Sequence, residues 1–276
     1  MSPEFDFITE NKAEHFNAGL GAGIFCDNSS SVTIDKSQIT DNIANSDGGG
    51  VACWSASLNI TNSIICNNTG RLAGGLDFSS ASSVNITNCT ISGNTCTYSD
   101  YGAEIAFLWC PSVMINNCIL WGNCPNEIKS YESILMVTYS DVGGGHSGTG
   151  NINSDPLFVG GRNYHLTASS PCIDTGTSSG APNTDIDGNP RPLGSGYDMG
   201  AYEFIPPCPN CSGDEVTITG KTFPPGGTCE CIGTISITIG TGVNIPSGAN
   251  VTFKAPKINV EPGFHAENGS IVKMQQ

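Results

Sequence analysis

Four cysteines near the C-terminal end of the chain have the type and spacing to do chemistry. Cys208 and Cys211 form a C-x2-C pair, Cys229 and Cys231 form a C-x-C pair, and 17 residues separate the two pairs. Thiolates in two close pairs can complete a tetrahedral zinc site, although the second pair lacks the usual two-residue gap. Two disulfides are the alternative, and they persist in oxidising compartments. The spacing alone leaves both interpretations open.

A second set of candidate ligands lies in the segment DIDGN. Asp185, Asp187 and Asn189 place side-chain oxygens at alternate positions there. Calcium is bound by oxygen ligands spaced in this way, but the segment lacks the rest of an EF-hand loop, including the glutamate at position 12. We therefore favour a turn whose acids pair with Arg191. We therefore expect no cofactor, with calcium at this turn as the alternative.

Carboxylates elsewhere do not form an evident catalytic pair. Hydrolysis of a glycosidic bond needs two carboxylates about 5 to 10 Å apart. Asp35 and Asp77 are both expected to point outward, but on different strand faces two coils apart. Asp100 with Glu104, near a turn, is a conceivable pair, although solvated surface acids are the more ordinary interpretation. We therefore assign no catalytic residues and expect a protein that is not an enzyme.

The elements that must position these residues follow from a pattern that occurs four times. Each copy reads Ser, apolar, x, Ile, x, x, Ser or Cys, x, Ile or Leu, x, x, Asn, and successive copies begin 26, 26 and 29 residues apart. A period of this length is typical of a solenoid. Apolar residues alternate within each copy, as Val32 and Ile34 do, which predicts strands and not helices. The copies span residues 31–42, 57–68, 83–94 and 112–123.

A second alternating segment precedes each copy and a third lies in its later half, so each coil is expected to hold three short strands. Such coils stack about 4.8 Å apart in a parallel β-helix, in which equivalent residues form continuous columns. We therefore predict an all-β chain, with a parallel β-helix followed by a small C-terminal β domain. One column holds asparagines, which tolerate a left-handed backbone and can hydrogen-bond along the stack. These are Asn42, Asn68, Asn94 and Asn123.

Inward columns also hold cysteines on adjacent coils. Cys26 is expected to lie beside Cys53, and Cys89 beside Cys118. Stacked inward cysteines usually pack as small hydrophobic residues. Disulfides between neighbouring coils are the alternative, provided that the Cα separation and the side-chain directions allow them.

The charge of the chain narrows the classes of partner. It has 25 acidic and 10 basic residues, and a formal net charge of −15, which argues against nucleic acid as a partner. Enzymes that eliminate across uronic-acid polymers need a cation and a basic residue near the substrate carboxylate. The only basic residues within residues 18–140 are Lys36, Arg71 and Lys129. The chain also lacks a run of eighteen apolar residues, so no membrane span is expected.

Several phrases in the coils and after them resemble known bacterial families. The GGG-V, NITNS and NITNC phrases of the coils resemble the repeats of polymorphic outer-membrane proteins. Residues 134–204, with the phrases VTYSDVGGG, NINSDPLFV and DMGAYEF, resemble the end of the bacterial surface proteins called choice-of-anchor Q. This resemblance implies a right-handed parallel β-helix from an exported protein, extracellular or at the cell surface. In such a setting the four cysteines near the C-terminal end favour disulfides over zinc.

The segment GTGVNIPSGANVTFKAPKINVEPGFHAENGSIVKM resembles the bacterial module called the 3-coathanger stack. A Pro- and Cys-rich linker precedes it and marks a boundary. We predict a β-helix over residues 1–204, with a capping segment at 131–204, then a linker at 205–213 and a small β domain at 214–276. Residues 8–12 match the end of a coil, so we expect either a fragment of a longer secreted protein or an open coil that pairs with another chain.

These observations predict a non-enzymatic extracellular or cell-surface scaffold that is adhesive or self-assembling, with filaments joined through open coil ends as one form of assembly. Its expected partners are copies of itself, carbohydrate or another cell-surface ligand. Trp54 and Trp121, expected to point outward near turns, are candidates for stacking on a sugar. The alternative is a glycan-binding module or a polysaccharide lyase or glycosidase. An aromatic-lined groove with converging carboxylates would favour that alternative.

Overall fold

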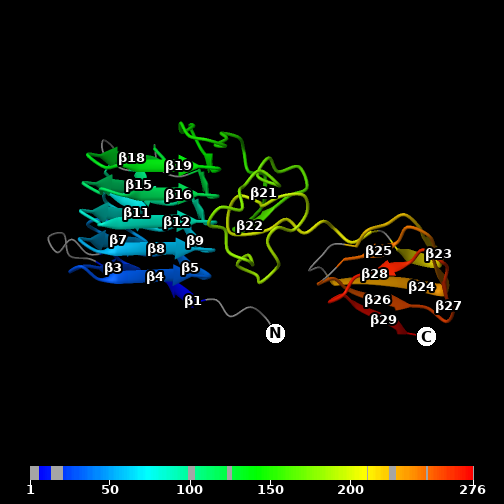
Figure 1. Cartoon of the computed structure of the whole chain (residues 1–276). Helices are drawn as coiled ribbons and strands as arrows, with labels where there is room; N and C mark the ends of the chain where they lie inside the picture. Colours follow the sequence, from blue (N-terminus) through cyan, green and yellow to red (C-terminus); the bar gives the residue numbers. More distant parts are fainter. Residues whose placement is uncertain are drawn as a thin grey trace. The chain divides into compact units, whose positions relative to one another are not determined.

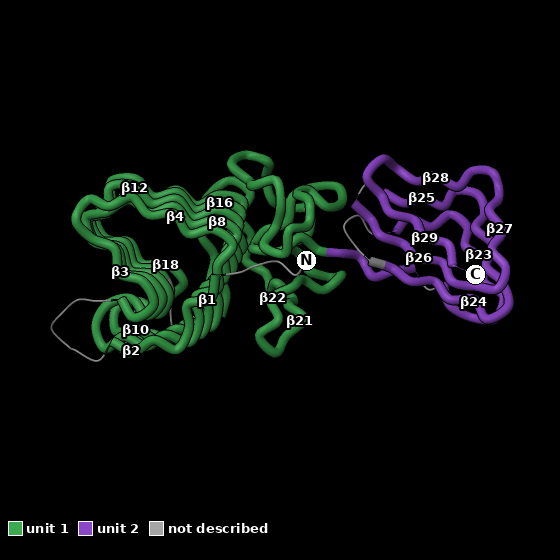
Figure 2. The backbone as a smooth tube through the Cα atoms, turned by 90° about the horizontal axis from the view of Figure 1, so that it is seen from below, with its two compact units in different colours: residues 1–204 green, residues 205–276 purple. Residues whose placement is uncertain are grey.

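The computed structural model describes residues 6–13, 21–98, 103–122, 126–209, 211–223, 228–246 and 248–275. The chain divides into two compact units, Met1–Phe204 and Ile205–Gln276, which Figure 2 colours separately. All regular elements in the described residues are β-strands. Within the same residues there is no helix long and apolar enough to cross a membrane.

The first unit is a stack of coils whose strands pair in parallel with those of the next coil (Figure 1). Three of its sheets enclose the core. Sheet A contains β1 (Asp6–Thr9), β5 (Ser37–Thr40), β9 (Ile64–Cys66), β13 (Thr90–Ser92), β17 (Ile119–Trp121) and β20 (Asp141–Val142). Sheet C contains β3 (Ile24–Cys26), β7 (Val51–Trp54), β11 (Ala73–Ser79), β15 (Ala103–Leu108) and β18 (Ile128–Tyr131). Sheet D contains β4 (Ser31–Asp35), β8 (Ser57–Thr61), β12 (Ser83–Thr87), β16 (Val113–Asn116) and β19 (Leu135–Thr138).

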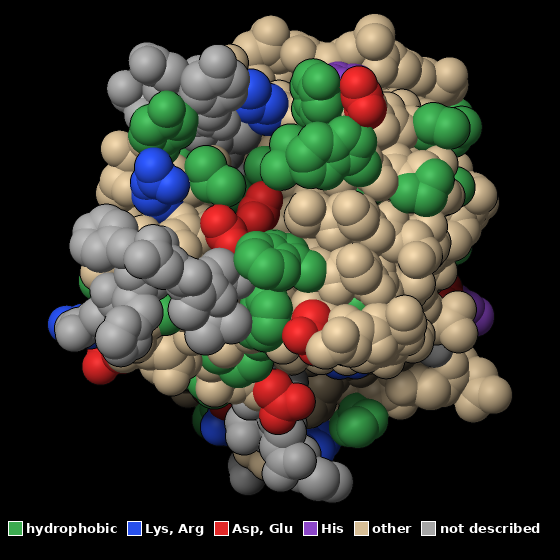
Figure 3. All heavy atoms as spheres, turned by 90° about the vertical axis from the view of Figure 1, so that its left-hand side faces the viewer, with side chains coloured by type: hydrophobic (Ala, Val, Ile, Leu, Met, Phe, Trp, Pro, Cys, Tyr) green, Lys and Arg blue, Asp and Glu red, His purple; other side chains and the backbone are tan. Residues whose placement is uncertain are grey.

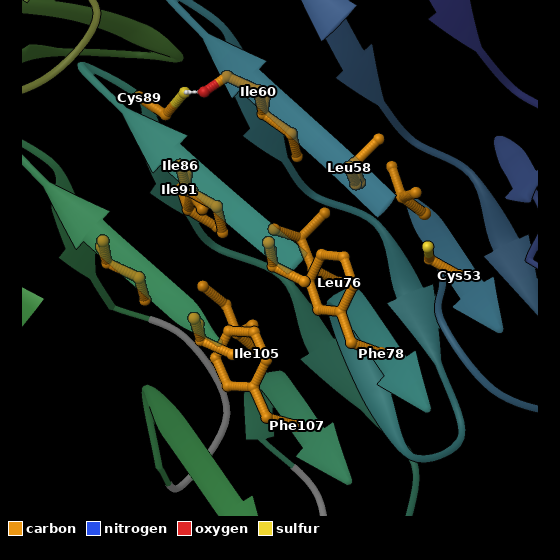
Figure 4. Close-up of a cluster of buried hydrophobic side chains, with 14 of the residues drawn as sticks. Cys53, Leu58, Ile60, Leu76, Phe78, Ile86, Cys89, Ile91, Ile105 and Phe107 are labelled. Atoms are coloured by element: carbon orange, nitrogen blue, oxygen red, sulfur yellow. Dashed lines mark hydrogen bonds between the residues drawn. The ribbon is translucent and has the colours of Figure 1, made fainter. Parts of the chain in front are cut away.

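The strands pair in the register that the repeat predicts. On β12, Val84 lies between Leu58 and Val113, and Ile86 lies between Ile60 and Ile115. Equivalent apolar residues therefore form continuous inward columns, whose burial supplies most of the stabilising free energy of the unit. Figure 4 shows part of this core, in which Phe78 and Phe107 stack with their ring centroids 5.2 Å apart. The predicted all-β fold with a parallel β-helix is confirmed.

A fourth sheet, absent from the three-strand prediction, follows the asparagine column. Sheet B contains the two-residue strands β2 (Lys12–Ala13), β6 (Ile43–Ala44), β10 (Thr69–Gly70) and β14 (Thr95–Cys96). Two residues are too few to show a two-residue period, so the pattern could not reveal them. The left-handed backbone is also displaced by one position, because positive φ occurs at Asp41, Asn67 and Gly93 and not at the asparagines that follow them.

The coils continue further than the predicted boundary at residue 131. β18, β19 and β20 pair with the preceding coil, so the last coil extends to Val142. The remaining residues of the unit, with the hairpin of β21 (Phe158–Gly160) and β22 (Asn163–Leu166), pack beside sheet A (Figure 1). Ile186, Ala201 and Tyr202 bury Ile64 and Cys66 there. This segment therefore covers the flank of sheet A.

The second unit is a smaller parallel stack with its own core. Phe223 and Phe253 are fully buried and meet edge to face with their centroids 5.9 Å apart. Its main sheet contains β23 (Ser212–Ile218), β24 (Thr228–Ile239), β26 (Asn250–Lys254), β27 (Ile258–Val260) and β29 (Ile271–Gln275). β25 (Asn244–Ile245) and β28 (His265–Ala266) form a second parallel pair.

Candidate functional site

Asp77 occupies an outward position on β11, at the centre of sheet C. Its neighbours in register are Ala52 on β7 and Ala106 on β15, and the column ends with Phe25 and Lys129. The two alanines are short, so they leave a hollow beside the carboxyl group. Asp77 is nevertheless only 1 % exposed. The side chain at this outward strand position is therefore buried.

A cavity of about 310 Å³ opens over this column. Figure 2 shows that the backbone bends inward along β3 to β18, and Figure 3, which looks at this side of the molecule, shows acidic side chains among hydrophobic ones. The volume is near the lower end of the range for small-molecule sites. We call this space the sheet C cavity, and its lining includes Leu72, Asp77, Tyr98, Leu108, Lys129 and Tyr131.

A second carboxyl group, that of Asp47, lies close to Asp77. Asp47 belongs to the connection between β6 and β7, and the next residue, Gly48, packs directly against Asp77. A Cβ atom on Gly48 would lie 3.2 Å from the Asp77 Cβ. Neither Asp47 Oδ2 nor Asp77 Oδ1 is exposed, and neither has a hydrogen-bond partner among the described residues. The structure therefore brings together two carboxyl groups, each with one buried oxygen that no hydrogen bond compensates.

The surroundings give the two carboxyl groups different acidities. Burial raises the pKa of Asp77 to about 7, and the negative charge of Asp47 contributes to the shift. Burial also raises the pKa of Asp47, but the Arg71 guanidinium opposes that shift. Near neutral pH, Asp77 therefore holds its proton more firmly than its neighbour. Two carboxyl groups set apart in this way can serve as a proton donor and a proton acceptor.

A cation and several aromatic rings lie close to these carboxyl groups or in the lining of the cavity. The Arg71 guanidinium lies 5.0 Å from the centre of the Tyr98 ring, in a cation–π contact. Tyr131, also in the cavity lining, is 53 % exposed and meets Trp109 edge to face, with the centroids 5.8 Å apart. Tyrosine rings in the lining of one cavity offer a surface suited to the apolar face of a sugar.

Of the other acids considered above as a catalytic pair, Asp35 lies apart from this site. Asp35 is exposed on sheet D, where it accepts a hydrogen bond of 2.5 Å from the Thr61 hydroxyl. It is therefore not a partner of Asp77. Asp100 and the Glu104 side chain lie outside the described residues.

The DIDGN turn is closed by its own hydrogen bonds. Asp185 accepts bonds from the Asn189 backbone (2.7 Å), the Asn189 side chain (3.0 Å) and the Glu203 backbone (3.0 Å). Asp187 accepts a bond of 2.8 Å from His165. The two Asp185 oxygens and Asp187 Oδ2, which were proposed for calcium, are thus engaged with protein groups. The described residues contain no group of three or more side chains that could hold a metal ion.

Arg191 does pair within this segment, although not with the turn. Its guanidinium contacts Glu203 at 2.5 Å, and both side chains are fully buried. It also donates to the carbonyl oxygens of Asp198 and Gly200. Burial, with a contribution from Glu203, raises the pKa of Asp198 to about 7. This network holds the end of the first unit together. The Arg191 side chain within it is shielded from solvent.

The four cysteines of the second unit form two disulfides, Cys208–Cys229 and Cys211–Cys231, with Cα atoms 5.7 and 4.9 Å apart. The thiolates that zinc would need are therefore absent. Both bonds attach the residues before β23 to β24.

The inward cysteines of the first unit are free thiols. Cys26 pairs in register with Cys53, and Cys89 and Cys118 lie on adjacent coils, all four buried. Cys89 contacts the carbonyl oxygen of Ile60 at 3.6 Å (Figure 4). Burial raises the pKa of the Cys89 thiol, which keeps it protonated and unreactive.

The asparagine column is a continuous hydrogen-bonded ladder. Asn42 donates from its side chain to Asn68 Oδ1, and Asn68 donates to Asn94 Oδ1, each at 2.9 Å. Asn11 extends the ladder toward the N-terminal end by donating to Asn42 Oδ1 at 2.8 Å. Asn123 lies outside the described residues.

The two tryptophans lie in different places. Trp54 is 37 % exposed on sheet C, in register with Ser79, and is not among the residues that line the sheet C cavity. Trp121 is on sheet A, where it lines a separate cavity of about 460 Å³ with Glu127 and His146. The structure does not bring them together, and only Trp54 shares a face with the carboxyl pair.

The comparison with protein families agrees with this architecture. A family model described as the right handed beta helix region matches residues 22–142, which are the coils that carry the sheet C cavity. No curated protein and no solved structure matches the chain significantly. The match and the stacked parallel sheets define an all-β protein with a right-handed parallel β-helix and a small C-terminal β unit.

The sequence interpretation missed Asp47. A signal for it was present in the phrase SDGGGV, because three glycines after an acid allow the backbone to approach the next coil closely. The glycine at position 48 allows the backbone beside Asp47 to approach Asp77 closely.

Proposed function

We propose that the protein is an exported, adhesive β-solenoid that binds a carbohydrate chain in the sheet C cavity. The observation that carries the proposal is the combination of tyrosine walls at Tyr98 and Tyr131 with charged groups at Asp77 and Lys129. Sugar rings have apolar faces that pack on aromatic rings, and hydroxyl groups that hydrogen-bond to charged side chains.

The disulfides support an extracellular location for the protein, and the net charge supports neutral glycans as its ligands. The two disulfides suit an oxidising environment outside the cytosol. The formal net charge of −15 disfavours polyanionic polymers such as uronic-acid chains. We therefore expect neutral glycans to be the ligands of the cavity.

Binding of neutral oligosaccharides tests this proposal. A glycan array would identify a ligand, and titration calorimetry would measure its affinity for the full chain. We expect Tyr131→Ala to weaken binding at least about tenfold, the loss of one aromatic contact of ordinary strength.

Met136→Ala is the matched control, because Met136 is exposed to a similar extent, 57 %, but lies on sheet D. It should bind like the wild type. Equal affinities of the two variants, or no neutral glycan bound at all, would contradict the proposal.

A further inference from the structure

Two thiols of the first unit face each other across neighbouring coils of sheet C. Cys26 on β3 pairs in register with Cys53 on β7, and both side chains belong to the buried core. The Cys53 thiol hydrogen-bonds to the Cys26 sulfur. Adjacent strands of a sheet lie about 4.8 Å apart, within the Cα separations of about 4.4 to 6.8 Å that disulfides span. A covalent bond between these two coils is therefore within geometric reach.

We propose that Cys26 and Cys53 form an oxidisable dithiol site, which a small disulfide compound converts into a disulfide that joins β3 to β7. The structure holds the site in its reduced form, because both cysteines are free thiols. Neither cysteine lines the sheet C cavity. The inference is therefore independent of glycan binding and goes beyond it.

Access and acidity both favour Cys26 as the thiol that reacts first. Cys26 is 5 % exposed, whereas Cys53 is fully buried. The hydrogen bond from Cys53 lowers the pKa of the Cys26 thiol, although burial and the negative charge of Asp27 oppose this shift. A thiol with a lowered pKa is more often the thiolate, which is the form that attacks a disulfide.

The other stacked pair, Cys89 and Cys118, lacks both advantages. Neither side chain is exposed. The Cys118 thiol donates to the carbonyl oxygens of Ile86 and Asn116, at 3.5 and 3.2 Å, and Cys89 also donates to backbone carbonyls. Burial raises the pKa of Cys89. We therefore expect this pair to stay reduced under conditions that oxidise Cys26 and Cys53.

The reaction balances with oxidised glutathione as the oxidant. The Cys26 thiolate attacks one sulfur of oxidised glutathione, whose S–S bond breaks and releases one glutathione thiolate. Cys53 loses its proton to solvent and attacks the Cys26 sulfur of the mixed disulfide, which releases the second glutathione thiolate. The two cysteines lose two electrons, and oxidised glutathione gains them. The two departing thiolates take up the two protons that the cysteines lost.

Peptide mapping of the full chain tests the proposal. After incubation with oxidised glutathione, mass spectrometry without reduction should show a cross-linked peptide that contains Cys26 and Cys53. The intact chain should lose the mass of two hydrogen atoms, whereas untreated protein should keep both thiols. Cys26→Ser should abolish the cross-link, and Cys89→Ser, the matched control, should leave it unchanged. Mapping of the wild type is decisive even where a variant fails to fold.

A second measurement asks whether the bond stabilises the coils that it joins. Calorimetry should show the transition of residues 1–204 at higher temperature in the oxidised chain than in the untreated one, because a cross-link restricts the unfolded chain. The oxidant should not shift this transition in Cys26→Ser.

The proposal has clear contrary outcomes. It would be overturned if Cys26 and Cys53 stayed reduced while the oxidant modified Cys96, the more exposed thiol of the same unit. A disulfide from Cys53 to Cys110 in place of Cys26 would also overturn it. None of these results bears on glycan binding, so the proposed function is tested separately.

Discussion

At the scale of single residues, Asp77 shows how context overrides pattern. Its position in the strand is outward, and an outward aspartate is ordinarily solvated. The close approach of Gly48 and the side chains around the sheet C cavity exclude water from it instead. The acidity of this carboxyl group is therefore a property of the fold and not of the strand that carries it.

This environment makes stability depend on pH. The pKa of an unfolded aspartate is about 3.9, whereas burial and the charge of Asp47 raise the pKa of Asp77 to about 7 in the folded state. The folded state holds the proton more tightly, so its stability falls as the pH rises from about 4 to about 7. We expect Asp77→Asn to be more stable than the wild type at pH 8, by up to about 4 kcal/mol. Urea unfolding at pH 4, 6 and 8 would measure the difference.

The comparison with the wild type isolates Asp77 from other titrating groups. Asp198 also has a pKa raised to about 7 by burial, but it titrates in both proteins. The gain in stability of Asp77→Asn over the wild type should shrink toward pH 4, because Asp77 is then protonated in the folded wild type. A difference that does not change with pH would show that Asp77 is ionised in the folded state over the whole range.

At the scale of elements, the asparagine ladder fixes the corner between sheets A and B. Asn68 donates to Ile39 O and Asn94 Oδ1, and its own oxygen accepts from the Asn42 backbone and side chain. Asn68→Ala leaves several of these buried groups unpaired. Each such group costs about 1–3 kcal/mol, so we expect a loss of roughly 2–4 kcal/mol in the free energy of unfolding.

Urea unfolding of Asn68→Ala against Asn59→Ala would measure this effect. Asn59 is on the outer face of sheet D, in the same coil, and is partly exposed. Its replacement should change stability by less than about 0.5 kcal/mol. Equal losses in the two variants would mean that the ladder adds nothing beyond ordinary side-chain contacts.

The same elements show what could be predicted from the sequence and what could not. The columns of Ile86 and Asn68 were predictable, because each coil repeats them at the same position. The convergence of Asp47 and Asp77 was not, since neither residue recurs in the other coils and a single acid has no period. Sheet B escaped prediction because its strands are two residues long. Repeated residues reveal the solenoid, whereas the two acids of the candidate site each occur at a position that the other coils do not repeat.

At the scale of the whole molecule, the two units have separate cores and different cysteine chemistry. Seven cysteines of the first unit are buried free thiols. Those of the second unit are cross-linked over separations of 21 and 20 residues. A small domain buries too little apolar surface to be very stable alone, so cross-links matter more to the second unit than to the first.

We therefore expect reduction to act on one unit only. A disulfide that closes a loop of this length stabilises a domain by about 3 kcal/mol, through the lost freedom of the unfolded chain. Calorimetry with and without a phosphine reductant should show the transition of residues 205–276 moving to lower temperature, while that of residues 1–204 stays in place. Limited proteolysis under the same conditions would assign the transitions, since cleavage should then concentrate after residue 205. An equal shift of both transitions would contradict the independence of the two cores.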